Sequence, residues 1–300
     1  MILMFMGRIT EARAALERAI EVFSVSHDAD RIAARTAGQD AGVSSLVLLA
    51  WVYWILGRVD EAVSRMAAAL ERADAVQHAH TQAYAWYYAS VLHALRGEQA
   101  IAQGYAERCL ALSEQQGFRH WLGLSRALRG ICLALLNGSG GRLDEVTVAL
   151  DAYQRGGYQL GLTVQFVLLC PVLLLRNEPD AALEVIDHGL SIVSHNSERF
   201  FEAELYRLKA CALLMRGAAG AADIEAEALL KQALQTARSQ QTRSLELRAA
   251  TDLARLWMSQ GKRNEALDVL SSIYAWFTEG FDTRDLKDAK KVLAQISHSA

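Results

Sequence analysis

The stretch GRVDEAVSRMAAALERA, from Gly57 to Ala73, decides the fold because its pattern recurs along the chain. Glycine can take the positive φ that ends a helix without steric cost. Small residues follow at Ala62 and, seven positions later, at Ala69. Seven residues make two helical turns, so both alanines lie on one face, where a neighbouring helix can approach closely. The stretch therefore predicts a helix end, a turn and a second helix.

Equivalent turns begin at seven places, roughly 42 residues apart: Gly7, Gly57, Gly97, Gly141, Asn177, Gly217 and Gly261. The small residues after these turns are Ala12, Ala62, Ala102, Ala182, Ala226 and Ala266, followed seven positions later by Ala19, Ala69, Cys109, Gly189 and Ala233. The preceding helices also carry small residues before the turn, at Ala50, Ser90, Gly130, Ala210 and Ala254. This recurrence predicts an all-α fold of about seven helix pairs.

The composition agrees with an all-helical chain and excludes several kinds of partner. Only two prolines, Pro171 and Pro179, interrupt 300 residues, and the formal net charge is −3. Without a Lys/Arg-rich tract, we expect no direct nucleic-acid partner and no membrane partner. The apolar run from Leu160 to Leu175 contains Gln165 and Pro171 and falls short of the ~20 residues that span a bilayer. It is predicted to be a core helix.

One copy departs from the pattern, and this departure sets the expected domain organisation. The copy at Gly141 has Val146 and Tyr153 where the others have small residues. Larger side chains there should push the helices apart, so we expect a kink or a weak point. The predicted architecture is a single solenoid over residues 1–300. Its parts are N-terminal repeats (1–136), a degenerate repeat (137–158), C-terminal repeats (159–281) and a capping helix (282–297) with its N-cap at Asp282 or Thr283.

The repeat resembles the tetratricopeptide (TPR) repeat, whose usual length of about 34 residues is shorter than the spacing here. The array as a whole is similar to the superhelical TPR domain of the maltose-activator type of bacterial regulator. The last third resembles the C-terminal TPR tail of bacterial signalling ATPases of the AAA/STAND type, which are often linked to a class III adenylate or guanylate cyclase or to a DNA-binding domain. The stretches that carry this likeness run from Glu198 to Leu214, from Ala226 to Ala266 and from Tyr274 to Leu293.

This resemblance implies a protein-binding regulatory module, the C-terminal sensor or scaffold arm of a signalling ATPase or cyclase system, in cis or in trans. The four widely spaced cysteines suit a reducing cytoplasm. The chain itself contains no phosphate loop of the form GxxxxGK[ST], and the GSGG at 138–141 lacks the following lysine. We therefore expect no enzyme activity, no catalytic residues and no cofactor. The alternatives are a domain that senses a small effector and an enzyme of a kind that no motif identifies.

Aromatic and charged residues on the first helices are the candidate partner-binding residues. Trp51, Trp54, Tyr84 and Tyr87 occupy positions that face the groove in TPR arrays, although tight packing could equally make them core. The corresponding later positions are charged, at Glu204, Arg207, Arg248 and Arg255. A groove that is apolar at one end and basic at the other would suit a protein segment with acidic residues at one end. Alternatively, the arginines only solvate an exposed face.

Histidines and cysteines are assigned structural roles. His78 and His80 form an HxH pair, with His93 and His120 downstream, but a polar connection explains them better than a metal site does. The four cysteines, Cys109, Cys132, Cys170 and Cys211, are far apart in apolar helical patterns and read as small buried hydrophobes. We expect no metal.

The first residues, MILMFM, precede the turn at Gly7 and form only the end of a first helix. Residues Met1 to Phe5 should therefore be exposed and call for a covering element. The chain would then be a piece of a longer polypeptide, or it would dock its first repeat on a separate subunit.

Overall fold

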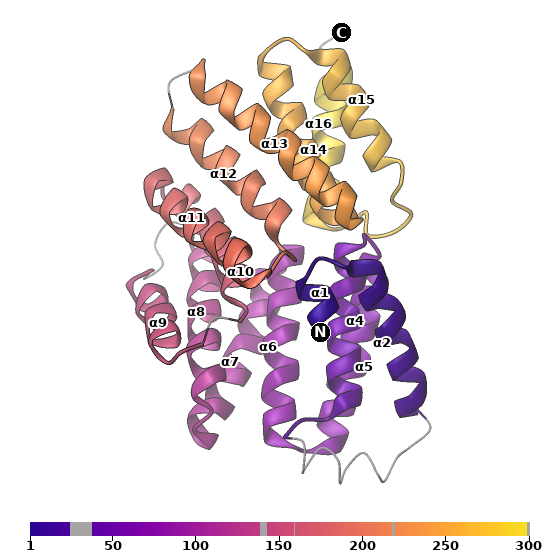
Figure 1. Ribbon diagram of the computed structural model, residues 1–300, viewed down its shortest axis with the longest axis vertical. Helices are drawn as coiled ribbons and strands as arrows, with labels where there is room; N and C mark the ends of the chain where they lie inside the picture. The colour runs from indigo at the N-terminus through magenta and orange to yellow at the C-terminus, as the bar shows by residue number, and fades with distance from the viewer. Residues whose placement is uncertain (25–37, 139–142, 159, 218–219, 299–300) are drawn as a thin grey trace. The chain divides into compact units, whose positions relative to one another are not determined.

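The computed structural model describes residues 1–24, 38–138, 143–158, 160–217 and 220–298. Over these residues the chain forms fifteen α-helices and no strand (Figure 1). The predicted all-α class is confirmed. The turn expected at Gly141 lies outside the described residues.

The helices alternate in the order that the repeat predicts, with a short turn inside each pair. Their bounds are α1 Ile2–Phe5, α2 Ile9–Ser24, α4 Ala41–Ile55, α5 Val59–Val76, α6 Ala79–Arg96, α7 Gln99–Gln116, α8 Arg119–Leu136, α9 Leu143–Arg155, α10 Leu162–Leu175, α11 Pro179–Asn196, α12 Glu202–Arg216, α13 Ala221–Gln240, α14 Arg243–Ser259, α15 Arg263–Tyr274 and α16 Arg284–His298. The described helices thus form seven successive pairs followed by one final helix, as predicted.

The chain divides into two compact units. The first unit consists of Met1, Thr10–Trp54 and Asp60–Leu168, and the second of Ile2–Ile9, Ile55–Val59 and Leu169–Ala300. In the first unit α6, α7, α8 and α9 pack in succession, and α6 also contacts α8. In the second unit α11 to α15 pack in succession, α12 contacts α14, and α14 contacts α16. The prediction of one continuous solenoid over residues 1–300 stays a prediction.

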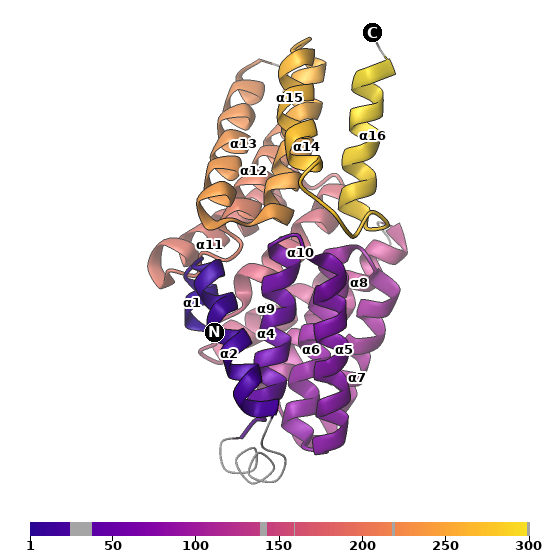
Figure 2. The ribbon, with the colours of Figure 1, turned by 90° about the vertical axis from the view of Figure 1, so that its right-hand side faces the viewer.

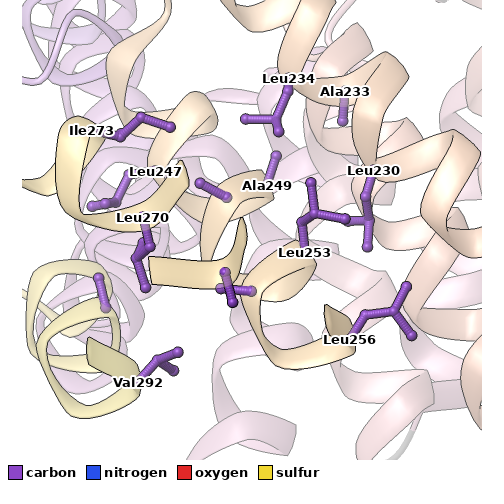
Figure 3. Close-up of a cluster of buried hydrophobic side chains, with 14 of the residues drawn as sticks. Leu230, Ala233, Leu234, Leu247, Ala249, Leu253, Leu256, Leu270, Ile273 and Val292 are labelled. Atoms are coloured by element: carbon purple, nitrogen blue, oxygen red, sulfur yellow. The ribbon is translucent and has the colours of Figure 1, made fainter. Parts of the chain in front are cut away.

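The core of the second unit shows why the small residues recur. Ala226, Ala233 and Ala266 are fully buried in one cluster with large leucines. Figure 3 shows Ala233 in this cluster with Leu230, Leu253 and Leu270. A methyl group at these positions lets two helix backbones approach, while the leucines fill the space between them. Ala62, Ala69, Ala102 and Cys109 are likewise 0% exposed in the first unit.

Glycine ends the first helix of several pairs in the way that the sequence predicts. Gly57, Gly97 and Gly261 have φ values of +84°, +84° and +75°. Gly217 does not, because its φ is −90°. A Cβ added at Gly217 would lie 2.5 Å from the Cβ of Ala222, so this glycine is required by a close contact instead.

The repeat with large residues is accommodated by glycines on the facing helix. Val146 and Tyr153 of α9 are buried, at 0% and 3% exposure. A Cβ on Gly130 of α8 would lie 2.6 Å from Val146 Cγ2, and a Cβ on Gly123 would lie 3.6 Å from Tyr153 Cβ. The usual small position of α8 is here a glycine, which leaves room for the larger Val146 side chain of α9. The predicted kink at 137–158 stays a prediction.

Two apolar segments are placed by the structure. The predicted core helix is α10, which is buried along most of its length, and no helix among the described residues is long and apolar enough to cross a membrane. At the start of the chain Met1 and Ile2 are exposed at 54% and 72%, but Met4 is fully buried, so the expectation that Met1 to Phe5 are all exposed is wrong. The carbonyl of Phe5 accepts a hydrogen bond from the backbone N–H of Arg199 (2.6 Å), and both residues belong to the second unit.

The final helix, α16, begins two residues later than predicted. Thr283 directly precedes it, and the Thr283 hydroxyl donates to the carbonyl of Gly280 (2.6 Å). Its apolar face is buried against α14 and α15 through Leu286, Ala289, Val292 and Ile296.

Candidate interaction surface

The four aromatic residues proposed to bind a partner lie inside the first unit. Trp51 and Trp54 of α4 are 2% and 1% exposed, and Tyr84 and Tyr87 of α6 are 6% and 3% exposed. Burial of this extent favours the alternative that they belong to the core. Their proposed contact with a partner stays a prediction, and it would require the side chains to leave their present packing.

Two further aromatic residues, Tyr88 and Trp121, complete this cluster. The indole N–H of Trp51 donates to the carbonyl of Tyr88 (3.1 Å), and the Trp121 ring centroid lies 5.7 Å from that of Tyr84 and 5.4 Å from that of Tyr87. Sequence reasoning missed both residues. The signal was present, because Tyr84 and Tyr88 are four residues apart and share a helix face.

The polar atoms of the cluster are mostly paired with one another. The indole N–H of Trp121 donates to His80 Nε2 (3.0 Å), and the Gln165 amide donates to the Tyr87 hydroxyl (2.9 Å). The Gln165 side chain is fully buried, yet its Oε1 has no hydrogen-bond partner among the described residues. A buried acceptor of this kind favours a donor from water or from a ligand.

Burial keeps the ionisable groups of the cluster neutral. It raises the pKa of the Tyr84 and Tyr87 hydroxyls well above the ordinary value. Burial, together with the nearby His80, lowers the pKa of His120 to about 4. The cluster is therefore uncharged at neutral pH.

The charged residues proposed for the groove form a connected network across three helices of the second unit. Arg207 of α12 donates twice to Glu204 (2.9 and 2.8 Å) and once to Asp252 of α14 (2.6 Å). Arg248 of α14 donates to Glu204 (3.0 Å) and to Asp285 of α16 (2.8 Å).

Exposure rises along this network from its inner to its outer end. The side chains of Glu204, Arg207 and Arg248 are 2%, 15% and 13% exposed. At the outer end Arg255 donates to Asp252 (2.7 Å) and to Asp288, and the side chains of Arg255 and Asp288 are 42% and 45% exposed. The outer end is therefore the part that a partner can reach.

The inner end is charged over the whole physiological pH range. Burial by itself would raise the pKa of Glu204, but the positive charges of Arg207 and Arg248 and the hydrogen bonds from both lower it to about 2. Cys211 lies beside the network, and its thiol donates to Asp252 (3.4 Å). Burial raises the pKa of this thiol, so it remains protonated.

The network corrects the expected charge of this face. Arg207, Arg248 and Arg255 were read as a basic groove, but every one of them is paired with a carboxylate. Three arginines face four acids, Glu204, Asp252, Asp285 and Asp288, which leaves a formal charge of −1. The signal that sequence reasoning missed is Asp252, four residues after Arg248 and three before Arg255, on the same helix face. Binding of a partner by these arginines stays a prediction.

The four histidines considered for a metal site, His78, His80, His93 and His120, each take part in a local contact. His78 Nδ1 accepts from the backbone N–H of Thr81 at the start of α6 (3.4 Å), and His93 Nδ1 lies 2.5 Å from Glu98. His80 accepts from Trp121, and the His120 ring centroid lies 4.4 Å from that of Trp121. Within the described part of the chain no three His, Cys, Asp or Glu side chains are grouped so as to hold a metal ion.

The cysteines of the apolar helices behave as buried small side chains. Burial raises the pKa of Cys109 to about 11 and those of Cys132 and Cys170 to about 12. Thiols of this kind are poor nucleophiles and poor metal ligands at neutral pH.

Comparisons with known proteins agree with this arrangement of helix pairs. Residues 1–24 match the family described as "Tetratricopeptide repeat". The crystal structure of yeast Tom70 superimposes on 86% of the chain and on 47% of Tom70, with a TM-score of 0.52 and 14% sequence identity. The fold is a TPR-like α-solenoid. The TPR2AB domain of yeast Sti1, solved with pHSP90, reaches a TM-score of only 0.35 at 13% identity, over 85% of this chain and 98% of that one, and carries no argument.

A curated relative matches most of this chain with a part of its own longer sequence. The TPR-like solenoid is 24% identical over 260 residues to an uncharacterized protein of Rhizobium meliloti (strain 1021), which covers 86% of this chain and 25% of the relative. The chain therefore spans about a quarter of the length of that relative and about half of Tom70.

Proposed function

We propose that this TPR-like solenoid is a protein-interaction scaffold that holds a segment of another protein. The observation that carries the proposal is the charged network of α12, α14 and α16, whose outer end, Arg255 and Asp288, is nearly half exposed. In TPR arrays the first helices of successive pairs line the groove, and α12 and α14 are first helices here. Ion pairs at the exposed end exchange partners at little cost, because exposed pairs are worth only about 0–1 kcal/mol.

The finer proposal is that the scaffold is the C-terminal arm of a bacterial signalling ATPase or nucleotide cyclase, in cis or in trans, in the cytoplasm. Its support is the resemblance of the last third of the chain and the greater length of the Rhizobium relative. The test is to read the DNA upstream of the Met1 codon and in the neighbouring gene. We expect an open frame that encodes an ATPase or cyclase module. Finding neither module would contradict this assignment but leave the scaffold proposal intact.

A peptide selection tests the scaffold proposal directly. Peptides selected on the purified chain from a displayed random library are remeasured against Arg255→Glu, which reverses the exposed arginine, and against Arg65→Glu as a control. Arg65 is an exposed arginine in the middle of α5. We expect Arg255→Glu to weaken binding roughly tenfold and Arg65→Glu to leave it unchanged. If the selected peptides bind Arg255→Glu with unchanged affinity, or if the selection enriches no peptide, the charged network is not the binding face.

A second candidate function, sensing of a small effector, is favoured by the buried and unpartnered Oε1 of Gln165 in the first unit. A ligand that donates to this oxygen should raise the thermal stability of the chain. Screening a metabolite collection by thermal shift, with Gln165→Leu as the control, tests this candidate. A stabilising compound whose effect persists in Gln165→Leu would argue against this location.

A further inference from the structure

The acidic and basic residues of helix α16 differ in their ion-pair partners. Its two acids, Asp285 and Asp288, are held by Arg248 and Arg255 of the neighbouring helix α14. Figure 2 shows α16 at the edge of the second unit, with α14 and α15 on one side of it. Both aspartates are therefore tied to α14, with Asp285 22% exposed and Asp288 45% exposed.

Four cations lie on the outer surface of α16, and the half-exposed Asp288 borders them. Arg284, Lys287, Lys290 and Lys291 are all exposed, and they lie three or four residues apart along the same side of the helix. Within the described part of the chain none of the four has an ion-pair partner. We call these four residues the cationic face of α16.

Folding does not account for this arrangement of charges. The helix dipole favours cations in the last turn, but the only basic residue there is His298. A terminal helix of a solenoid needs a polar outer side, yet acids would serve as well as bases, and protein surfaces ordinarily mix both signs. The chain as a whole has a net charge of −3, so the cationic face of α16 is opposite to the overall balance.

We propose that the cationic face of α16 docks an acidic segment of a protein partner. The proposal rests on the scaffold function above and adds a second contact surface, distinct from the exposed end of the charged network. From Arg284 to Lys291 the helix rises about 10 Å. An extended segment advances about 3.3 Å per residue and alternate side chains face the same side, so acids at every second position, about 6.6 Å apart, come nearest to the rise of about 4.5–6 Å between successive cations along the helix.

The chemistry of α16 favours an acidic protein over an anionic membrane. A helix that binds a membrane surface inserts an apolar side into the lipid. The apolar side of α16, which contains Leu286, Val292 and Ile296, is buried in the core. On the exposed side of the helix, the residues beside the cations are Ala294, Gln295 and Ser297. A nucleic acid offers a denser row of charge than four cations on two helical turns would neutralise.

The test measures binding of a fluorescent peptide by anisotropy. The probe is a 15-residue peptide with Glu or Asp at every second position and Gly or Ser elsewhere, and its control has Lys at the same positions. The full chain is compared with Lys287→Glu/Lys291→Glu and with Arg18→Glu/Arg65→Glu. Both double variants change the net charge by the same amount, and Arg18 and Arg65 are exposed in α2 and α5. Circular dichroism checks that each variant remains helical.

We expect the acidic probe to bind at low salt and to lose at least roughly tenfold in affinity in Lys287→Glu/Lys291→Glu, with less than a twofold change in the control variant. Equal losses in both variants would mean a general charge effect and overturn the proposal. Binding of the Lys peptide would also overturn it. So would a result in which a 15-nucleotide oligothymidylate or phosphatidylserine vesicles bind the chain and lose affinity in Lys287→Glu/Lys291→Glu, while the acidic probe does not bind. Because Arg255 stays intact throughout, failure here leaves the peptide selection on the charged network as an independent test.

Discussion

At the scale of single residues, the fold depends on small side chains at the positions where two helices contact each other. Ala62 and Ala266 are 0% exposed, and each stands five residues after a glycine turn. A larger side chain at either position must displace a neighbouring helix, since the interior is close-packed.

We therefore predict that Ala62→Leu and Ala266→Leu each lower the free energy of unfolding by about 1–3 kcal/mol. Ala67→Leu, at an exposed position of the same helix as Ala62, should change it by less than about 0.5 kcal/mol. Urea titrations of the three variants measure the difference. Half-buried Ala68 should give an intermediate value, and equal losses at all positions would show that the register of the repeat is wrong.

The contact of Gly130 in α8 with Val146 in α9 gives a second prediction at this scale. Gly130→Ala should destabilise the chain by about 1–3 kcal/mol, because its Cβ would lie 2.6 Å from Val146 Cγ2. Combining it with Val146→Ala should recover part of that loss, which a double-mutant cycle measures.

The control for that cycle is a helical glycine with open space around it. A Cβ on Gly104 of α7 meets nothing within 4 Å. Gly104→Ala should therefore stabilise the chain by about 0.5–1 kcal/mol. A purely additive cycle at Gly130 and Val146 would contradict the proposed compensation.

At the scale of elements, α12, α14 and α16 are joined by charges, and this junction should respond to acid. The pKa of Glu204 is lowered from its ordinary value of 4.5 to about 2. A carboxyl group with a lowered pKa stabilises the fold fully above its unfolded pKa and loses that contribution as the pH falls toward its folded pKa. The loss of stability from Glu204 is thus expected between about pH 5 and pH 2.

Glu204→Gln should remove this acid response and cost about 3–5 kcal/mol at pH 7, since Arg207 and Arg248 lose a buried charged partner. The measurement is the urea midpoint from pH 7 down to pH 3. Glu225→Gln, at an exposed position of α13, is the control and should follow the wild-type curve. An unchanged acid response in Glu204→Gln would show that other carboxyl groups carry it.

The aromatic residues of α4 provide a further prediction at this scale. Trp54 is 1% exposed, so Trp54→Ala should destabilise the chain by about 3–5 kcal/mol. Trp276 is 44% exposed, and Trp276→Ala should cost much less. If Trp54→Ala instead unfolds at the wild-type urea concentration, the tryptophan is not a core residue, and a role in the groove becomes the better interpretation.

The sequence pattern was sufficient to predict the helices, but not the charge and burial of the side chains on the first helices of the pairs. Glycine turns and alanines at fixed spacing reveal helix pairs, because backbone conformation and close packing restrict residue type locally. The partners of Arg248 and Arg255 come from two other helices and from Asp252, and a pattern search that follows one residue type misses them. For Trp51 and Trp54, burial depends on which helices cover α4, and a single sequence does not contain that information.

At the scale of the whole molecule, the chain should bind without catalysing. The sequence has no phosphate loop, and the acids of the charged network are all engaged by arginines. We predict that the purified chain neither hydrolyses ATP nor forms cyclic nucleotides. Assays with Mg²⁺ and with Mn²⁺ check this, and turnover that persists at constant specific activity through repurification would contradict it.

The glycines of α8 also limit how this protein could be recombined. In most pairs the two helices obey the same packing rule, so one helix could be exchanged for its counterpart from another repeat. In α8 and α9 the large side chains are on α9 instead, and Gly130 leaves the space that Val146 fills. A chimaera that takes α9 from a standard repeat would leave a void beside Gly130, and one that takes α8 from a repeat with alanine at this position would clash with Val146. Neither helix can therefore be exchanged alone, and α8 together with α9 is the smallest unit here that can be transplanted.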